Sequence, residues 1–84
     1  MPDIDVLSRL PPGDSATVAG LSTIGNMRKR LQDIGLIEGT TVRCLQRSPL
    51  GDPTAFLIRG AVIALRAMDS AGVLIQESIQ ERMH

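Results

Sequence analysis

Apolar residues in this chain come in short runs, most of them separated by glycine or proline. The longest unbroken run, Ala61–Leu65, is far too short to cross a membrane as a helix. Short β-rich runs bounded by turn residues are typical of strands. With 84 residues the chain has room for one domain with a small core. We therefore expect a single β-rich domain without a membrane-spanning segment.

Five of these runs have the composition of β-strands. Two of them are separated only by Arg59-Gly60, which predicts a tight hairpin turn with Gly60 at positive φ. Ala67–Ala71 is expected to form a turn. The predicted strands are Thr17–Leu21, Thr41–Gln46, Thr54–Ile58, Ala61–Arg66 and Val73–Ile75.

One helix is predicted between the first and second strands. Ser22, Thr23 and Asn26 are alternative residues for its N-terminal cap, and Gly35 stands where a left-handed C-terminal cap belongs. Helical spacing places four apolar residues on one face of this helix: Ile24, Met27, Leu31 and Ile34.

Five short strands with one inserted helix indicate a mostly β fold, a small five-stranded antiparallel barrel. Closing the sheet removes the exposed edges that short strands otherwise leave. The predicted core consists of Val18, Leu21, Met27, Leu31, Ile34, Val42, Cys44, Phe56, Ile58, Ile63, Leu65, Val73 and Ile75.

Composition excludes several classes of function. Nine basic and nine acidic residues cancel, so the chain lacks the basic field of a nucleic-acid-binding protein. Phe56 is the single aromatic residue, which argues against base stacking. Cys44 is the single cysteine, which excludes a disulfide within the chain and any zinc site needing two cysteines. The acidic start of the chain does not look like a secretory signal, and we expect a cytoplasmic protein.

Five short motifs, in this order and spacing, closely resemble the FeoA family of ferrous-iron transport protein A. Many relatives have proline where this chain has Glu38, a difference that leaves the turn at Gly39 permissive. The motifs are Arg30–Leu36, Gly39-Thr40, Pro49–Pro53, Arg59-Gly60 and Ala64–Arg66.

The resemblance covers about residues 7–77 and implies a barrel of the SH3-like type. It predicts one domain over residues 1–77, followed by a polar tail at 78–84. It also implies a cytosolic protein that works beside the membrane Fe(II) permease FeoB, which carries a cytosolic G-protein domain. Because fold alone does not determine function, these remain expectations drawn from the family.

No catalytic or cofactor site is predicted. His84 is the only histidine and lies at the C-terminus, while Cys44 alternates with inward residues of a strand and should be buried. If the tail is helical, His84 shares a face with Glu81 and Glu77, an arrangement that would hold a divalent ion weakly. The alternative is a plain polar tail. We expect no enzyme activity, no cofactor and no metal site.

Two exposed features are candidate contacts for a partner protein. Placing Met27 and Leu31 inward turns the basic run Arg28–Arg30 toward solvent, where it is either a solvated face or a docking face for an acidic partner or anionic lipid. The proline-containing loop 49–53 is either a simple turn or an apolar contact. Leu36 and Ile37, just after the helix, are either a lid on the core or an exposed contact. The predicted contact residues are Arg28, Lys29, Gln32, Leu36, Leu50, Asp52 and Pro53.

The favoured function is a non-enzymatic cytosolic accessory protein of ferrous iron uptake. It is expected to dock on the G-protein domain or the cytosolic face of FeoB, at the inner face of the membrane, and to modulate the permease. Weak self-association is an open possibility for a neutral domain with exposed leucines. The alternatives are a regulatory SH3-like module of an iron-dependent repressor system and a weak Fe(II) metallochaperone.

Overall fold

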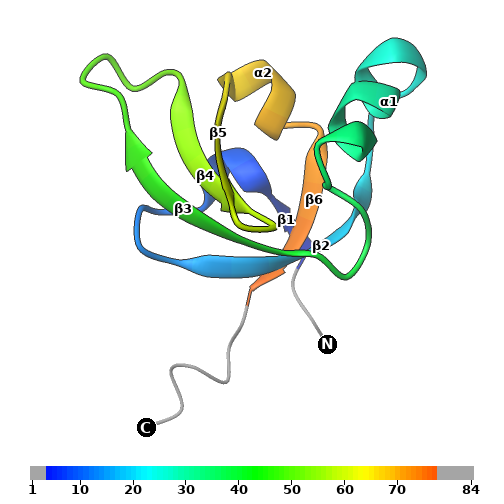
Figure 1. The fold of residues 1–84 in the computed structure, drawn as a ribbon, viewed down its shortest axis with the longest axis horizontal. Helices are drawn as coiled ribbons and strands as arrows, with labels where there is room; N and C mark the ends of the chain where they lie inside the picture. The colour runs from blue at the N-terminus through cyan, green and yellow to red at the C-terminus, as the bar shows by residue number, and fades with distance from the viewer. Residues whose placement is uncertain (1–3, 78–84) are drawn as a thin grey trace, which may run out of the picture.

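A computed structural model describes residues 4–77 of the chain (Figure 1). The predicted tail at 78–84, with His84 and Glu81, lies outside the described residues. In chain order the elements are β1 (Ile4–Val6), η1 (Leu7–Arg9), β2 (Ser15–Leu21), α1 (Gly25–Asp33), β3 (Thr41–Arg47), β4 (Thr54–Ile58), β5 (Ala61–Leu65), α2 (Ala67–Ser70) and β6 (Val73–Glu77).

Over residues 4–77 the strands form one antiparallel sheet in the order β1-β6-β2-β3-β4-β5. The sheet curls around a shared core, and α1 and α2 lie along its upper edge in Figure 1. The prediction of a mostly β antiparallel fold with an inserted helix is confirmed. The predicted number of five strands is too low, because β1 was missed. That strand has three residues with Asp5 at its centre, so it lacks an apolar run of strand length.

The β4–β5 hairpin confirms its predicted turn. Arg59 and Gly60 both have positive φ, 51° and 85°, which matches the twist of the two strands. Strand β5 ends one residue before its predicted end, since Arg66 is extended and precedes α2. The turn predicted at Ala67–Ala71 is instead the short helix α2. Its first N–H, that of Ala67, donates to Asp52 Oδ1 at 2.9 Å, a long-range cap that local sequence does not reveal.

The start of α1 differs from all three predicted caps. Ile24 precedes the helix without a side-chain capping hydrogen bond, and the helix begins at Gly25, whose φ is +68°. Ser22 instead lies within 3.4 Å of the Gly72 carbonyl, to which its hydroxyl donates. Ile24 is also wrong as a member of the apolar face, because its side chain is 85% exposed.

The C-terminal cap of α1 is confirmed. Gly35 has φ +105°, and its N–H donates to the Gln32 carbonyl. The position also needs glycine for space. A Cβ there would lie 2.6 Å from Cδ of Arg59, so the hairpin turn packs directly against the helix end.

The predicted core is confirmed. Of its thirteen residues, Leu21, Met27, Ile34 and Ile63 are partly buried against the cluster, and the other nine are buried. The structure adds Leu7, Leu10, Ala16 and Leu36. No helix within residues 4–77 is long and apolar enough to span a membrane.

Candidate protein-docking surface

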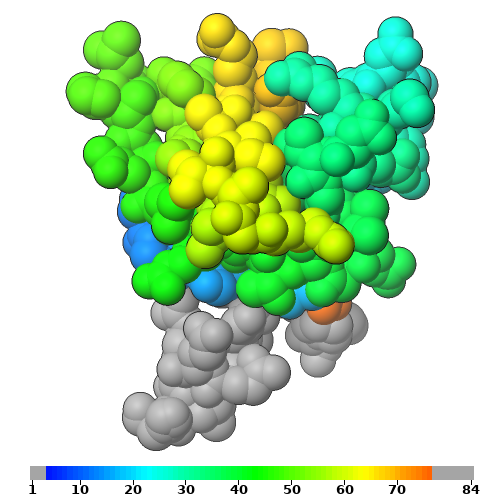
Figure 2. Space-filling model, in the orientation of Figure 1, coloured from blue at the N-terminus to red at the C-terminus, as the bar shows by residue number. Residues whose placement is uncertain are grey.

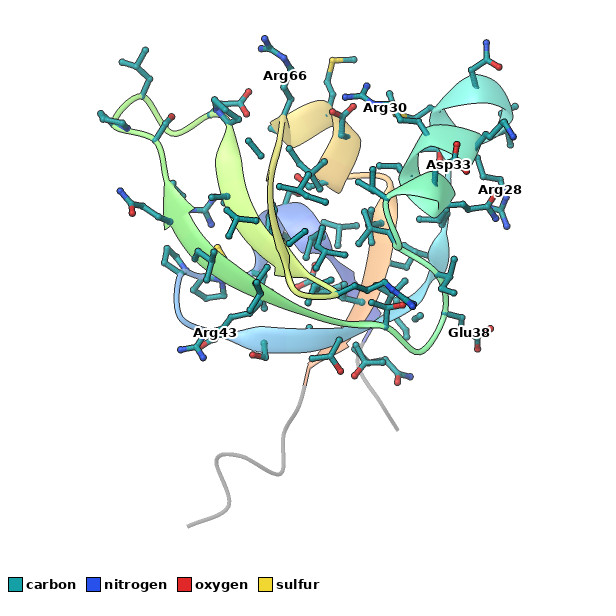
Figure 3. All side chains as sticks on the ribbon, viewed as in Figure 1. Arg28, Arg30, Asp33, Glu38, Arg43 and Arg66 are labelled. Carbon is teal, nitrogen blue, oxygen red and sulfur yellow. The ribbon has the colours of Figure 1, made fainter. Side chains whose placement is uncertain are left out.

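The outer face of α1 presents the polar side chains that the sequence predicted there. Arg28, Lys29 and Gln32 are all exposed. Figure 3 shows Arg28 on the side of α1 away from α2, and its Nη1 donates to the Leu21 carbonyl at 3.2 Å. This hydrogen bond spans the gap between α1 and the end of β2. The outer face is therefore a preformed surface with two cationic side chains.

The inner side of α1 is fixed to α2 by an ion pair. Arg30 Nη2 lies 3.9 Å from Asp69 Oδ2, and Figure 3 shows the arginine directed toward α2. The Asp69 side chain is only 7% exposed, whereas that of Arg30 is 63% exposed. The pair therefore links the inner side of α1 to a buried carboxylate of α2.

The loop between β3 and β4 is closed by its own hydrogen bonds. The Ser48 N–H donates to the Pro53 carbonyl at 3.0 Å, and the Gly51 N–H donates to the Ser48 carbonyl at 2.8 Å. The Asp52–Pro53 peptide bond is cis. The two hydrogen bonds close the loop, and Leu50 at its tip has 92% of its surface exposed.

Asp52 has a structural contact in addition to its predicted role. Its carboxylate accepts the Ala67 N–H, which ties the loop to the start of α2. The Arg30–Asp69 pair in turn ties α2 to α1. The loop, α2 and α1 therefore form a connected row, which reaches the upper edge of the molecule in Figure 2.

Leu36 was predicted as a contact residue, and the structure corrects this placement. Its side chain is 0% exposed. The Leu36 N–H donates to the Leu31 carbonyl, so the chain folds back under the helix end and carries the side chain into the core. Ile37, the next residue, is 46% exposed.

Two highly exposed apolar residues were not predicted to be part of this surface. Met68 of α2 is 82% exposed, and Ile24 stands just before α1. Met68 was missed because α2 itself was not predicted. The sequence did contain a signal that Ile24 lies outside the helix. Gly25 follows it directly, and glycine disfavours helix at that point, so the apolar stripe is interrupted there.

Other chemistry in the described residues is limited. Residues 4–77 contain no group of three His, Cys, Asp or Glu side chains arranged to hold a metal ion. No cavity is found in this part of the chain. Cys44 is buried, and this burial raises the pKa of its thiol above the ordinary 9.0, against the opposing effect of Arg47. The thiol is therefore protonated at neutral pH, the less reactive form.

Comparison with known proteins identifies relatives over most of the chain. Over 70 residues it is 33% identical to a Porphyromonas gingivalis protein described as an Fe(2+) transport protein A/Fe(2+) transporter FeoB fusion protein. The aligned region covers 83% of this chain, but the chain spans only 8% of that protein's length.

Solved structures share the fold. The FeoA protein from Chlorobium tepidum is 32% identical, with a TM-score of 0.80 over 87% of this chain and 70% of that chain. FeoA from Stenotrophomonas maltophilia, solved with zinc and described as an SH3 domain protein, is 27% identical. It has a TM-score of 0.75 over 83% of this chain and 87% of that chain. These likenesses confirm the SH3-like fold.

The sequence model of the FeoA domain matches residues 6–77, which is nearly all of the described structure. The match contains every motif on which the resemblance was based. This chain therefore belongs to the FeoA domain family.

Proposed function

We propose that this protein is a non-enzymatic accessory protein of ferrous iron uptake. In this proposal it acts in the cytoplasm, at the inner face of the membrane, by docking on the Fe(II) transporter FeoB. The observation that carries the proposal is the relative in which an FeoA part and FeoB share one polypeptide. A fusion holds its parts at a high local concentration, which favours parts that must touch in order to act.

The outer face of α1 is the main contact in this proposal. Docking needs an ordered surface rather than a cavity, and Arg28, Lys29 and Gln32 stand on a helix fixed from both sides. A surface that is already ordered loses little conformational entropy on binding. Its two cations favour an acidic region of the transporter's cytosolic part.

The β3–β4 loop supplies a second contact. Leu50 offers an exposed apolar side chain on a loop that its own hydrogen bonds keep closed, next to Asp52 and Pro53. An apolar side chain that leaves water at a partner's surface contributes affinity, whereas the polar residues around it mainly set orientation.

Docking modulates FeoB if the protein binds one conformation of the transporter more tightly than another. A tenfold difference in affinity shifts the equilibrium between two states by about 1.4 kcal/mol. The nucleotide bound to the G-protein domain is the natural variable that distinguishes such states. This mechanism requires no chemical step by the accessory protein.

The test is calorimetric titration of this protein into full-length FeoB in lipid nanodiscs, loaded with GDP or with a GTP analogue. We expect binding whose dissociation constant depends on the nucleotide. The matched control is the Arg28→Glu, Lys29→Glu double variant, which should bind at least tenfold more weakly. Absence of binding in both nucleotide states would refute docking, and equal affinity in both would refute modulation through the nucleotide state.

A further inference from the structure

The outer side of strands β3, β4 and β5 is an apolar surface that the docking proposal does not use. Strand register places Leu57 between Arg43 and Val62, with Arg43 opposite it on β3 and Val62 opposite it on β5. Residues directly opposite in a sheet point to the same side. The next outward row joins Gln46, Ala55 and Ala64.

This surface is exposed at its centre. Val62 is 67% exposed and Leu57 is 36% exposed, although both lie within strands. Figure 2 shows the β4–β5 hairpin, in lime and yellow, across the middle of the viewed face without another element over it. Outward positions of a sheet that faces water are normally polar. Here both strands of the hairpin lack any polar outward residue between their ends.

The charged side chains of these three strands all have one sign. The whole chain is neutral, but β3, β4 and β5 contain no aspartate or glutamate. Arg43 lies beside Leu57, and Arg66 continues the outward row Val62–Ala64 into the extended residue before α2. Figure 3 shows these two arginines at opposite ends of the sheet, one low and one at the upper edge.

The two other arginines of this region have different surroundings. Arg47 directs Nη2 to the Leu10 carbonyl at 3.3 Å, on the inner side of the sheet. Arg59 packs its aliphatic part against Gly35. Acidic residues near the three strands lie outside them. Glu38 precedes β3 and Asp52 is bonded to α2, whereas Asp69 pairs with Arg30 and the Asp14 carbonyl accepts the Cys44 N–H.

The two edge strands of the sheet, β1 and β5, differ in how well they are protected against pairing with another chain. Strand β1 is short and carries Asp5, whose carboxylate accepts the Val6 N–H at 2.8 Å and lies 3.6 Å from Arg9. Charge and short length protect an edge strand against unwanted pairing. Strand β5 is longer and has no charged residue. An unprotected apolar edge strand in a folded domain is typical of a surface that a partner covers.

We propose that this hairpin face docks an acidic protein segment with apolar side chains at its centre. In the complex the apolar side chains cover Val62 and Leu57, and carboxylates pair with Arg43 and Arg66. An apolar centre with arginine at the rim is the usual composition of a protein interface. Two arginines are too few for tight binding to a nucleic-acid backbone. The hairpin face is formed by Arg43, Ala55, Leu57, Val62, Ala64 and Arg66.

The inference rests on the proposed function, because it assigns the acidic segment to the same Fe(II) transporter. FeoB would then contact the hairpin face in addition to the outer face of α1 and the β3–β4 loop. Like charge disfavours a second copy of this chain in symmetric pairing along β5. Antiparallel pairing would bring Arg66 of one copy toward Arg59 of the other, and like charges opposite each other in a sheet are destabilising.

The experiment measures the affinity of full-length FeoB in nanodiscs for variants of the hairpin face. The first variant is Val62→Asp and the second is Arg43→Glu combined with Arg66→Glu. Each should weaken binding at least tenfold, because each places negative charge against an acidic segment. The matched control is Ile4→Asp, the same kind of change at a 52% exposed apolar residue of the opposite edge strand β1, which should stay within twofold of wild type.

The outcomes separate this inference from the proposed function. If the hairpin variants bind like wild type while the α1 double variant does not, the hairpin face is refuted and docking stands. If wild type does not bind FeoB at all, both are refuted. If vesicles of anionic lipid without FeoB bind the protein and the hairpin variants abolish this binding, the face belongs to lipid and the inference is wrong. Thermal melts of every variant identify any loss of binding that is caused by unfolding. Val62→Thr keeps a β-branched side chain, so it should fold, and its dissociation constant should rise by less than tenfold.

Discussion

The contact between Gly35 and Arg59 allows a quantitative prediction for the Gly35→Ala variant. Its φ of +105° is unfavourable for any residue with a Cβ, at a cost of about 1–2 kcal/mol. The new Cβ would also stand 2.6 Å from Arg59 Cδ and 3.3 Å from Arg59 Cγ. The arginine must leave its rotamer, at a further cost of about 0.5–1.5 kcal/mol. The free energy of unfolding should therefore fall by about 1.5–3.5 kcal/mol.

Gly39→Ala is the matched control for this variant. Gly39 has a similar φ of +93°, but an added Cβ there meets nothing within 4 Å. This variant should lose only the backbone contribution, about 1–2 kcal/mol. Combining Gly35→Ala with Arg59→Ala should reduce the loss to that of Gly39→Ala, after correction for Arg59→Ala alone.

Urea unfolding followed by circular dichroism measures all four variants. The comparison between glycines matters more than either absolute value, because both share the same backbone cost. If Gly35→Ala and Gly39→Ala lose the same free energy within about 0.3 kcal/mol, the Arg59 contact has no energetic effect and the reasoning is wrong. If the double variant is no better than Gly35→Ala, Arg59 is not the group that the methyl displaces.

Three further predictions concern binding, loop closure and pH. Arg28→Glu with Lys29→Glu should weaken FeoB binding tenfold or more but lower the melting temperature by less than about 4 °C, since both side chains are exposed and only the solvent-exposed Arg28–Leu21 hydrogen bond is lost; a larger fall in melting temperature would contradict this. Asp52→Ala should cost about 1 kcal/mol in urea unfolding by removing the acceptor for Ala67 N–H, and Asp52→Asn, which keeps an oxygen acceptor, should cost less. Burial raises the pKa of the Cys44 thiol, so the protonated thiol stabilises the folded state relative to the unfolded state. This contribution to the free energy of unfolding is complete below pH 9.0 and is lost as the pH rises above that value. Cys44→Ala should flatten the dependence of the free energy of unfolding on pH in this alkaline range. An unchanged slope in the variant would show that other groups cause the dependence.

Local features of the chain were predictable from sequence where one short segment determines its own conformation. The β4–β5 turn follows from two residues between two β-rich runs, and the end of α1 follows from Gly35. Long-range contacts determine the features that failed. Helix α2 depends on a carboxylate fifteen residues earlier in the chain, and Leu36 is buried because the chain folds back under α1.

The candidate surfaces show the same division. Helical periodicity correctly placed Arg28, Lys29 and Gln32 in solvent, because a polar stripe opposite an apolar one defines which side faces out. The hairpin face has no such contrast. The predicted core correctly included the inward residues Phe56, Ile58, Ile63 and Leu65, but the outward residues of β4 and β5 are apolar too, so no polar contrast marked them as a surface. Only the register of the sheet reveals that Val62 and Leu57 share an exposed side with Arg43.

Helix α2 makes the state of the β3–β4 loop measurable. A helix of four residues has no stability of its own in water, so α2 persists through its surroundings, among them Asp52 and Arg30. Its amides at Ser70 and Ala71 donate within the helix, and they exchange with solvent when α2 opens. A partner that binds Leu50 and draws the loop away should therefore accelerate deuterium uptake at these two amides, whereas a partner that holds the loop closed should slow it. Two backbone signals would thus report the loop's conformation in a chain with no tryptophan to serve as a fluorescent probe.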